Sequence, residues 1–263
     1  MTQVNWRLGV VGSPVSHSLS PQLHEAGLRL AGLTGTSTRV ELPLERADEL
    51  SGLLRNEYDA LSVTSPLKHA SFARCDELSD VARRTESVNS LRVVDGKLHG
   101  ISTDGDGFIY GIEFELGLTV ANAHAVVLGA GGAASAIVDA LVRYDAASIV
   151  VHGRTESKVE ALVRRYTNVH ASSLVYRPVD LIVNTVPVVG RIPEAAVLQG
   201  VHHDTVAVDI TYDPRQSEWR DRYSDAGCRT MNGLAMLACQ AALQMQWWWG
   251  VDIEGGDLLE ALQ

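Results

Sequence analysis

Lys68 stands at a place in the sequence where an unused lysine is unfavourable. It follows Ser65-Pro66, and a helix is predicted from Pro66 to Cys75 with Ser65 as its N-cap. A cation in the first turn of a helix meets the positive end of the helix dipole, so surface lysines prefer the other end. A lysine here either extends into solvent or takes part in chemistry, and proton transfer is the chemistry that suits an amine.

Two other polar residues lie at the ends of predicted strands, where they could serve Lys68 as partners. Asp104 lies in the segment Ser102-Thr103-Asp104-Gly105, and Asn89 stands at the start of a strand expected over 90–94. An aspartate beside Lys68 would orient it and balance its charge. Each of these residues is ordinary by itself, so the predicted catalytic pair of Lys68 and Asp104 depends on their combination.

A run of serine hydroxyls, at Ser16, Ser18 and Ser20, precedes another predicted helix. Hydroxyls at alternating positions could bind a polyhydroxylated or carboxylate ligand. A simpler interpretation is structural, with Ser20 as the N-cap of the helix and Pro21 as its first residue. Without further context, these residues favour the structural interpretation.

A glycine-rich turn between a predicted strand and a predicted helix is typical of a nucleotide site. It reads Gly129-Ala130-Gly131-Gly132-Ala133, which is GxGGxA rather than the strict GxGxxG pattern. Glycines here let a pyrophosphate approach the backbone at a helix N-terminus, whose free N–H groups favour anions. Such turns also close ordinary strand–helix units, so the turn alone is a weak signal.

The end of the next predicted strand strengthens the nucleotide interpretation. It reads Gly153-Arg154-Thr155, with Lys158 one helical turn further on. An NAD site usually has an acidic residue at this place to hold the ribose 2′-OH, whereas an arginine accommodates a 2′-phosphate. We therefore predict NADP rather than NAD. The alternative is that Arg154 and Lys158 begin a solvated helix.

Short apolar runs alternate with longer amphipathic segments along the chain, which indicates an α/β fold with parallel strands. Strands are expected at 7–12, 37–42, 60–65, 90–94, 123–129, 147–153, 180–186 and 205–212. Helices are expected at 21–32, 66–75, 131–145 and 233–250, the last of them ended by Gly250. Only the second half has a glycine-rich turn, so we predict two domains with a boundary between residues 103 and 120.

Composition narrows the class of protein. The 263 residues allow one large domain or two ordinary ones, and a net charge of −10 argues against nucleic acid as a partner. Three widely spaced cysteines, Cys75, Cys228 and Cys239, form no CxxC motif and no disulfide framework, which favours a reducing compartment. The sequence has no signal-peptide pattern and no long apolar stretch. We therefore expect a cytoplasmic protein with no membrane partner and no metal ion.

Eight motifs, in order along almost the whole chain, resemble those of the shikimate dehydrogenase family, which includes the quinate/shikimate dehydrogenases. Those of the first half are GSPVSHSLSPQLH, SVTSPLK, ESVNSL and STDGDG. Those of the second half are GAGGAA, GRT, DITYDP and NGLAMLACQAA. One such motif is modest evidence, whereas eight in the family's order are highly specific.

The resemblance implies an N-terminal α/β substrate domain that the C-terminal helices rejoin (1–104 and 233–263) and a Rossmann-like NADP-binding domain (105–232). It also implies the reversible reduction of 3-dehydroshikimate to shikimate, a step of aromatic amino acid biosynthesis, by a monomer or a homodimer. By matching position, the substrate-binding residues are Ser18, Ser20, Thr64, Lys68, Asn89, Asp104, Tyr212 and Gln240. The cofactor-binding residues are Gly129, Ala130, Gly131, Gly132, Ala133, Arg154, Thr155 and Lys158.

The sequence also departs from the family's motifs. Ser62 replaces the usual asparagine before Val-Thr, and Ser102 replaces an asparagine before Thr-Asp. Glu86 stands where a small residue is usual, and we expect it to face solvent. These changes put the substrate preference in question. The alternatives are a quinate/shikimate dehydrogenase with relaxed specificity and a regulatory NADP-binding paralogue with little turnover.

Overall fold

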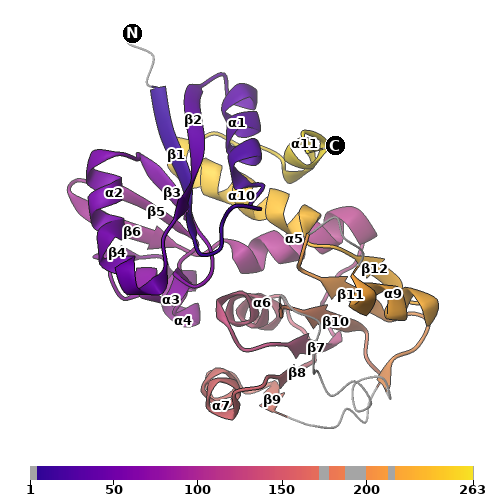
Figure 1. Cartoon of the computed structure of the whole chain (residues 1–263). Coiled ribbons are helices and arrows are strands. Elements are labelled where there is room, and N and C mark those ends of the chain that lie inside the picture. The colour runs from indigo at the N-terminus through magenta and orange to yellow at the C-terminus, as the bar shows by residue number, and fades with distance from the viewer. Residues whose placement is uncertain (1–4, 172–177, 187–199, 213–216, 263) are drawn as a thin grey trace. The chain divides into compact units, whose positions relative to one another are not determined.

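The chain forms two compact units (Figure 1). The computed structural model describes residues 5–171, 178–186, 200–212 and 217–262. The first unit combines Met1–Gly111 with Leu237–Gln263, and the second comprises Ile112–Met236. The divisions fall within helices α5 (Asp104–Leu116) and α10 (Leu234–Trp249), so each of these helices contributes residues to both units.

The first unit is built on a six-stranded mixed sheet with the strand order β2-β1-β3-β5-β6-β4. Its strands are β1 (Asn5–Gly12), β2 (Thr34–Glu41), β3 (Ala60–Val63), β4 (Glu77–Leu78), β5 (Ser90–Val94) and β6 (Lys97–Ile101). β1 is parallel to β2 and β3, whereas β5 is antiparallel to β3 and β6. Its helices are α1 (Ser20–Leu30), the 3-10 helix η1 (Leu44–Glu49), α2 (Leu50–Asn56), α3 (Lys68–Phe72), α4 (Asp80–Thr85) and α11 (Gly255–Glu260), together with parts of α5 and α10.

Alternation along the strands sends apolar side chains to both faces of this sheet. On β3, Leu61 joins one core cluster that includes Leu50 of α2, and Ala60 joins another that includes Leu23 of α1. The second cluster also contains Trp248 from α10, so the C-terminal helix packs with the N-terminal strands in one core. The predicted end of α10 is confirmed, because Gly250 has a φ of +69° and its N–H donates to the carbonyl of Gln246.

The second unit is a six-stranded, fully parallel sheet with the order β12-β11-β10-β7-β8-β9. This order is that of the doubly wound Rossmann fold, so the predicted fold class is confirmed. The strands are β7 (His124–Leu128), β8 (Ser148–His152), β9 (Val169–Ala171), β10 (Leu181–Asn184), β11 (Val206–Asp209) and β12 (Arg229–Met231). Its described helices include α6 (Gly132–Arg143), α7 (Glu156–Val163) and α9 (Glu218–Asp225).

The predicted helix caps at Ser20 and Ser65 are wrong. α1 begins at Ser20 itself, whose Oγ accepts a hydrogen bond from the Ser18 hydroxyl rather than capping the helix. α3 begins only at Lys68, because the N–H of Leu67 donates to the carbonyl of Thr64 and closes a separate turn before the helix. Both differences come from local hydrogen bonds that compete with the capping geometry.

The described part of the chain contains no helix that is both long enough and apolar enough to cross a membrane.

Candidate functional site

Strand directions in the first unit bring the predicted polar segments to one edge of its sheet. Parallel β1 and β3 end at this edge, antiparallel β5 begins there, and β6 ends there. Thr64 follows β3, Asn89 precedes β5, and Thr103-Asp104 follow β6. Residues separated in the sequence therefore meet because of the order and directions of four strands.

The predicted pair of Lys68 and Asp104 is formed. The Nζ of Lys68 lies 2.7 Å from Oδ2 of Asp104, and their side chains are 17% and 6% exposed. Asp104 is the first residue of α5, where the helix dipole favours a carboxylate. Lys68 is likewise the first residue of its helix, so Asp104 compensates the unfavourable placement of its charge.

Asn89 holds the other oxygen of Asp104. Its Nδ2 lies 2.9 Å from Oδ1 of Asp104 and 2.9 Å from Oγ1 of Thr103, and its own Oδ1 accepts the backbone N–H of Thr103. Both carboxylate oxygens of Asp104 thus have a donor, one from Asn89 and one from Lys68. The side chain of Asp104 is fixed before any ligand binds.

Gln240 reaches this cluster from α10 because α5 has a glycine at the crossing. A Cβ added to Gly107 would lie 2.6 Å from the backbone nitrogen of Gln240, which only glycine avoids. At this approach Oε1 of Gln240 accepts a hydrogen bond from Asn89 Nδ2 at 3.1 Å, and its backbone carbonyl accepts one from the Thr103 hydroxyl at 3.0 Å.

Ser18 and Ser20 lie together between β1 and α1. Both are buried, and the hydroxyl of Ser18 donates to that of Ser20 at 3.2 Å. Two guanidinium nitrogens of Arg39 on β2 donate to the carbonyl of Ser18, at 2.9 and 2.6 Å. The sequence interpretation did not include Arg39, because nothing in the local pattern of β2 marks it as different from any exposed arginine.

Two of the residues that depart from the family pattern, Glu86 and Ser62, have opposite surroundings. Glu86 is exposed and ends α4 with a φ of +50°, in agreement with the expectation that it faces solvent. Ser62 is buried, and its hydroxyl lies within hydrogen-bond distance of His24 and Gln244. Thr64 and Lys68 are half-buried at the same edge of the sheet.

The glycine-rich turn of the second unit has the predicted strand–turn–helix form. Gly129 follows β7 with a φ of +119°, and Gly131 is the N-cap of α6, which has no side-chain cap. Among the residues that the structure describes, none lies within 4 Å of a Cβ added to Gly131, so these residues leave the helix N-terminus open there. Ala130, Gly132 and Ala133 beside it are half-buried. Uncapped N–H groups with open space above them suit a phosphate.

The predicted 2′-phosphate residues follow the neighbouring strand. Leu128 of β7 is paired with His152 of β8, so the glycine turn and Arg154 leave the same edge of the parallel sheet. Arg154, Thr155 and Lys158 are all exposed. Within the described parts of the chain, neither Arg154 nor Lys158 has an ion-pair partner, which leaves two cations available to an anionic ligand.

Tyr212, also predicted to bind substrate, lies in the second unit just after β11 and is half-buried. Near it is a buried carboxylate that the sequence interpretation missed. Asp209 accepts hydrogen bonds from Asn184 Nδ2 at 3.3 Å and from the Thr211 hydroxyl at 2.9 Å, and Ser217 donates to its other oxygen. A polar residue at the end of each of two buried strands was the available signal, and Asp209 here joins the end of β10 to Thr211 and Ser217.

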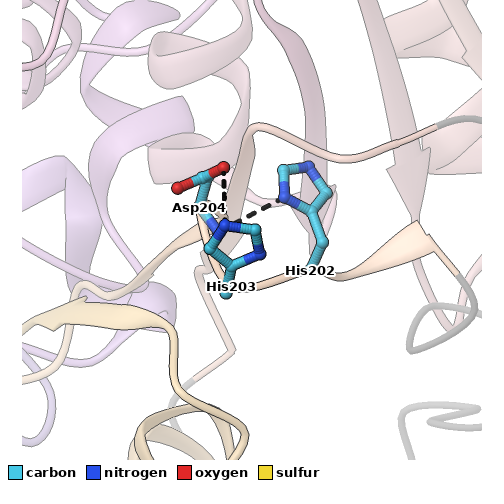
Figure 2. A group of neighbouring side chains, drawn as sticks. All are labelled: His202, His203 and Asp204. Carbon is cyan, nitrogen blue, oxygen red and sulfur yellow. Dashed lines mark hydrogen bonds and ion pairs between the residues drawn. The ribbon is translucent and has the colours of Figure 1, made fainter.

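Three side chains that could in principle bind a metal ion lie close together before β11 (Figure 2). One side-chain atom from each of His202, His203 and Asp204 lies within 4.8 Å of the others. His203 forms an exposed ion pair with Asp204, and Nδ1 of His202 accepts the backbone N–H of Asp204. The hydrogen bonds of a turn account for this arrangement, and we assign it no role in the chemistry.

The fold and these side chains define the class. A Rossmann sheet with a glycine-rich turn, together with a mixed α/β unit that holds a lysine–aspartate ion pair, is the architecture of a two-domain, dinucleotide-binding α/β protein. Comparison with known proteins then gives the family. A model described as the shikimate dehydrogenase substrate binding domain matches residues 10–91, and one described as shikimate / quinate 5-dehydrogenase matches residues 113–191.

Full-length relatives agree with the family models. The chain is 32% identical to a shikimate dehydrogenase (NADP(+)) of Methanopyrus kandleri, over 92% of this chain and 90% of the relative. It is 31% identical to one of Exiguobacterium, over 97% and 98%. A crystal structure of the Thermus thermophilus shikimate 5-dehydrogenase with NADP(H) and shikimate matches with a TM-score of 0.86 and 31% identity, over 97% of this chain and 98% of that one. The chain belongs to the shikimate dehydrogenase family, as its motifs predict.

Proposed function

We propose that this protein is an NADP-dependent shikimate dehydrogenase, which interconverts 3-dehydroshikimate and shikimate in aromatic amino acid biosynthesis. The observation that carries the proposal is the ion pair of the half-buried Lys68 and the buried Asp104, 2.7 Å apart at the edge of the first sheet. The names of the relatives from Methanopyrus and Exiguobacterium state the same activity. A pure NADP-binding regulator has no need of a proton-transfer pair, so the pair favours an enzyme over a regulatory paralogue.

Lys68 moves the proton. In shikimate oxidation its unprotonated Nζ takes the proton of the C3 hydroxyl while the hydrogen on C3 leaves as hydride, and in the reverse direction the ammonium returns the proton to the oxygen. Asp104 accepts hydrogen bonds from both Lys68 and Asn89, so it fixes the direction in which Nζ points. Bound NADP supplies the hydride chemistry.

The neighbouring polar groups orient the substrate. The hydroxyls of Ser18 and Ser20 bind the carboxylate, and Arg39 keeps their loop in place through the carbonyl of Ser18. Thr64, Asn89, Asp104 and Gln240 bind the ring hydroxyls, with Tyr212 as a further contact. Holding the ring at several points converts binding free energy into orientation of the reacting carbon.

The second unit provides the cofactor site. Gly129 to Ala133 bind the pyrophosphate at the uncapped start of α6, where a Cβ at Gly131 would project into open space. Arg154, Thr155 and Lys158 bind the adenosine 2′-phosphate, and the two exposed cations favour NADP over NAD. All of these residues come from one chain, so the site is compatible with either a monomer or a homodimer.

A quinate/shikimate dehydrogenase with relaxed specificity is a second candidate. Ser62 stands where the family usually has asparagine, and its hydroxyl is bonded to Gln244 and His24. The ring therefore loses one of the polar side chains that the family pattern offers at this edge. A site that makes fewer hydrogen bonds to substrate hydroxyls discriminates less between related rings.

The deciding experiment follows NADPH absorbance after purified protein is mixed with shikimate or quinate and with NADP or NAD. Rapid reduction with shikimate and NADP alone supports the main proposal. Turnover with quinate as well supports relaxed specificity. Absence of turnover with any pair, despite measurable NADP binding, would refute the enzyme and leave the regulatory paralogue.

A further inference from the structure

A continuous line of buried hydrogen bonds leads from the Lys68–Asp104 pair into the core of the first unit. Asn89 Nδ2 contacts Oε1 of Gln240 at 3.1 Å, and Nε2 of Gln244 contacts the same oxygen at 2.6 Å. Gln244 lies one turn further along α10, so the two amides stack on one face of the helix. Gln244 is only 1% exposed, so its amide cannot hydrogen-bond to solvent and needs partners within the protein.

The line of hydrogen bonds continues from Gln244 through three more elements, β3, α1 and β2. The hydroxyl of Ser62 on β3 donates to Oε1 of Gln244 and lies 2.9 Å from Nε2 of His24 on α1. Nδ1 of His24 lies 2.7 Å from the Ser37 hydroxyl on β2. Gln240, Gln244, Ser62, His24 and Ser37 are thus joined in one line of side-chain hydrogen bonds, which is completed by the backbone carbonyls of Leu237 and Asn89.

The number of protons that each side chain can donate fixes the direction of these hydrogen bonds. The single hydroxyl proton of Ser62 is used on Gln244, so Ser62 can only accept from His24, and Nε2 of His24 must carry a proton. Nδ1 then accepts from Ser37. At the other end, Nε2 of Gln244 donates, so Oε1 rather than Nε2 of Gln240 faces Asn89.

His24, near the end of this line of hydrogen bonds, keeps one protonation state. Its ring is fully buried, packs edge-on against Trp248 with centroids 5.1 Å apart, and has a pKa lowered to about 3 by burial. It therefore keeps one charge state and one tautomer over the ordinary pH range. A neutral, fixed imidazole imposes the same direction on every bond that follows it.

We propose that Gln244, Ser62 and His24 act as a positioning relay, which holds the side-chain amides of Gln240 and Asn89 in the single orientation that serves Asp104 and Lys68. Without Gln244, the amide of Gln240 keeps only the bond from its Nε2 to the carbonyl of Leu237 and loses the donor that holds its Oε1. The orientation of this amide is then less strictly fixed, and so is the bond from Asn89 to Asp104. This inference rests on the proposed dehydrogenase function.

The relay also determines which hydrogen-bonding group of Gln240 remains for a ligand. Its Oε1 is occupied by two donors, and its Nε2 donates to the carbonyl of Leu237 at 2.8 Å, which leaves one N–H. Gln240 therefore presents a hydrogen-bond donor to a substrate hydroxyl oxygen. The group touches substrate, whereas Gln244, Ser62 and His24 act only through it and through Asn89.

The test compares Gln244→Met and Gln244→Glu with the matched control Gln246→Met, an exposed glutamine on the same helix. Methionine has a similar size but removes both hydrogen-bonding groups, and glutamate keeps the acceptor for Ser62 but removes the donor for Gln240. We expect kcat for shikimate oxidation to fall about 10- to 100-fold in both Gln244 variants, with KM for NADP and the control unchanged. A wild-type kcat in a folded Gln244→Met protein would overturn the relay.

A second readout needs no variant and no activity. Nitrogen-15 NMR of the labelled wild-type protein reports which nitrogen of His24 carries the proton. The relay requires the Nε2–H tautomer, unchanged between about pH 5 and pH 8, and an Nδ1–H tautomer would overturn it. If the wild-type protein oxidised no shikimate, the proposed function would fail and the relay's role with it, whereas an active wild type with an unaffected Gln244→Met fails the relay alone.

Discussion

The two units prepare for their ligands in opposite ways. In the first, the polar groups of the candidate site are largely buried and are bonded to one another, from Lys68 and Asp104 to Asn89 and Gln240. In the second, the start of α6 has no side-chain cap, Gly131 faces open space, and Arg154 and Lys158 are exposed.

This difference agrees with the role that we propose for each unit. A proton donor must point in one direction to be useful, so its orientation has to be set by the protein before the substrate arrives. A phosphate, in contrast, brings its own charge and many acceptor atoms, so it needs only uncapped N–H groups and accessible cations. The first unit is therefore organised in advance, and the second leaves its binding groups unpartnered.

The largest effect is expected from Lys68→Ala. Removing the amine removes the proton donor and acceptor, so kcat should fall about 10²- to 10⁴-fold while KM for shikimate changes little. Steady-state kinetics in both directions measure this. Lys97→Ala, which breaks the exposed pair with Glu77, is the control and should keep the wild-type kcat. An unchanged kcat in Lys68→Ala would exclude Lys68 from the chemistry.

The next largest effect concerns cofactor binding by the second unit. Arg154→Asp replaces a cation by an anion at the predicted 2′-phosphate contact, so Kd for NADP should rise about 10- to 100-fold and Kd for NAD much less. Fluorescence titration with both cofactors measures the ratio. Arg164→Asp serves as the control because Arg164 is exposed and paired with Glu160. An equal loss for the two cofactors would contradict the assignment.

Two glycines give a direct contrast between the units. In Gly107→Ala the new Cβ would lie 2.6 Å from the Gln240 backbone, and overpacking should lower stability by about 1–3 kcal/mol, partly offset by better helix propensity. In Gly131→Ala the new Cβ would meet none of the described residues within 4 Å, so thermal stability should change little while NADP binding weakens. Thermal melts and cofactor titrations of both variants test this, and a destabilised Gly131→Ala would contradict it.

The smallest effect concerns the buried histidine. His24 has a folded-state pKa of about 3 against an ordinary 6.5, so below pH 6.5 only the unfolded state binds a proton there. The contribution of His24 to stability is complete above pH 6.5 and is lost as the pH falls towards 3. Between about pH 7.5 and pH 5.5 the loss is about 1.4 kcal/mol. Urea unfolding of wild type and of His24→Gln measures it, and equal pH dependence in the two proteins would contradict the assignment.

Features with a local cause could be predicted from the sequence. The apolar runs of β7 and β8 and the glycines between β7 and α6 predicted a parallel sheet with a nucleotide turn, and Lys68 was correctly placed in a first helical turn. The motifs identified the family. The unfavourable position of Lys68 relative to the helix dipole suggested the pair with Asp104 only in combination with the polar segments around Asn89 and Asp104.

Features that depend on distant contacts could not be predicted. The hydrogen bond from Ser62 to Gln244 joins residues 182 positions apart, and neither sequence neighbourhood indicates it. A glutamine four residues after Gln240 on an apolar helix was a signal, but its meaning requires the packing of α10 with β3. The helix caps failed for the opposite reason, because two local bonds replace the capping geometry: the Ser18 hydroxyl donates to that of Ser20, and the N–H of Leu67 donates to the carbonyl of Thr64.

The first unit is discontinuous in the chain, since Leu237–Gln263 complete a unit that begins at the N-terminus. During synthesis on the ribosome, the second unit emerges whole while the first still lacks α10. The face of the first sheet that packs with α10 therefore stays only partly covered, by α1, until α10 leaves the exit tunnel. The polar cluster around Asp104 is completed late in synthesis, and a chain that stops before Gln240 ends with a formed Rossmann sheet and an unfinished site.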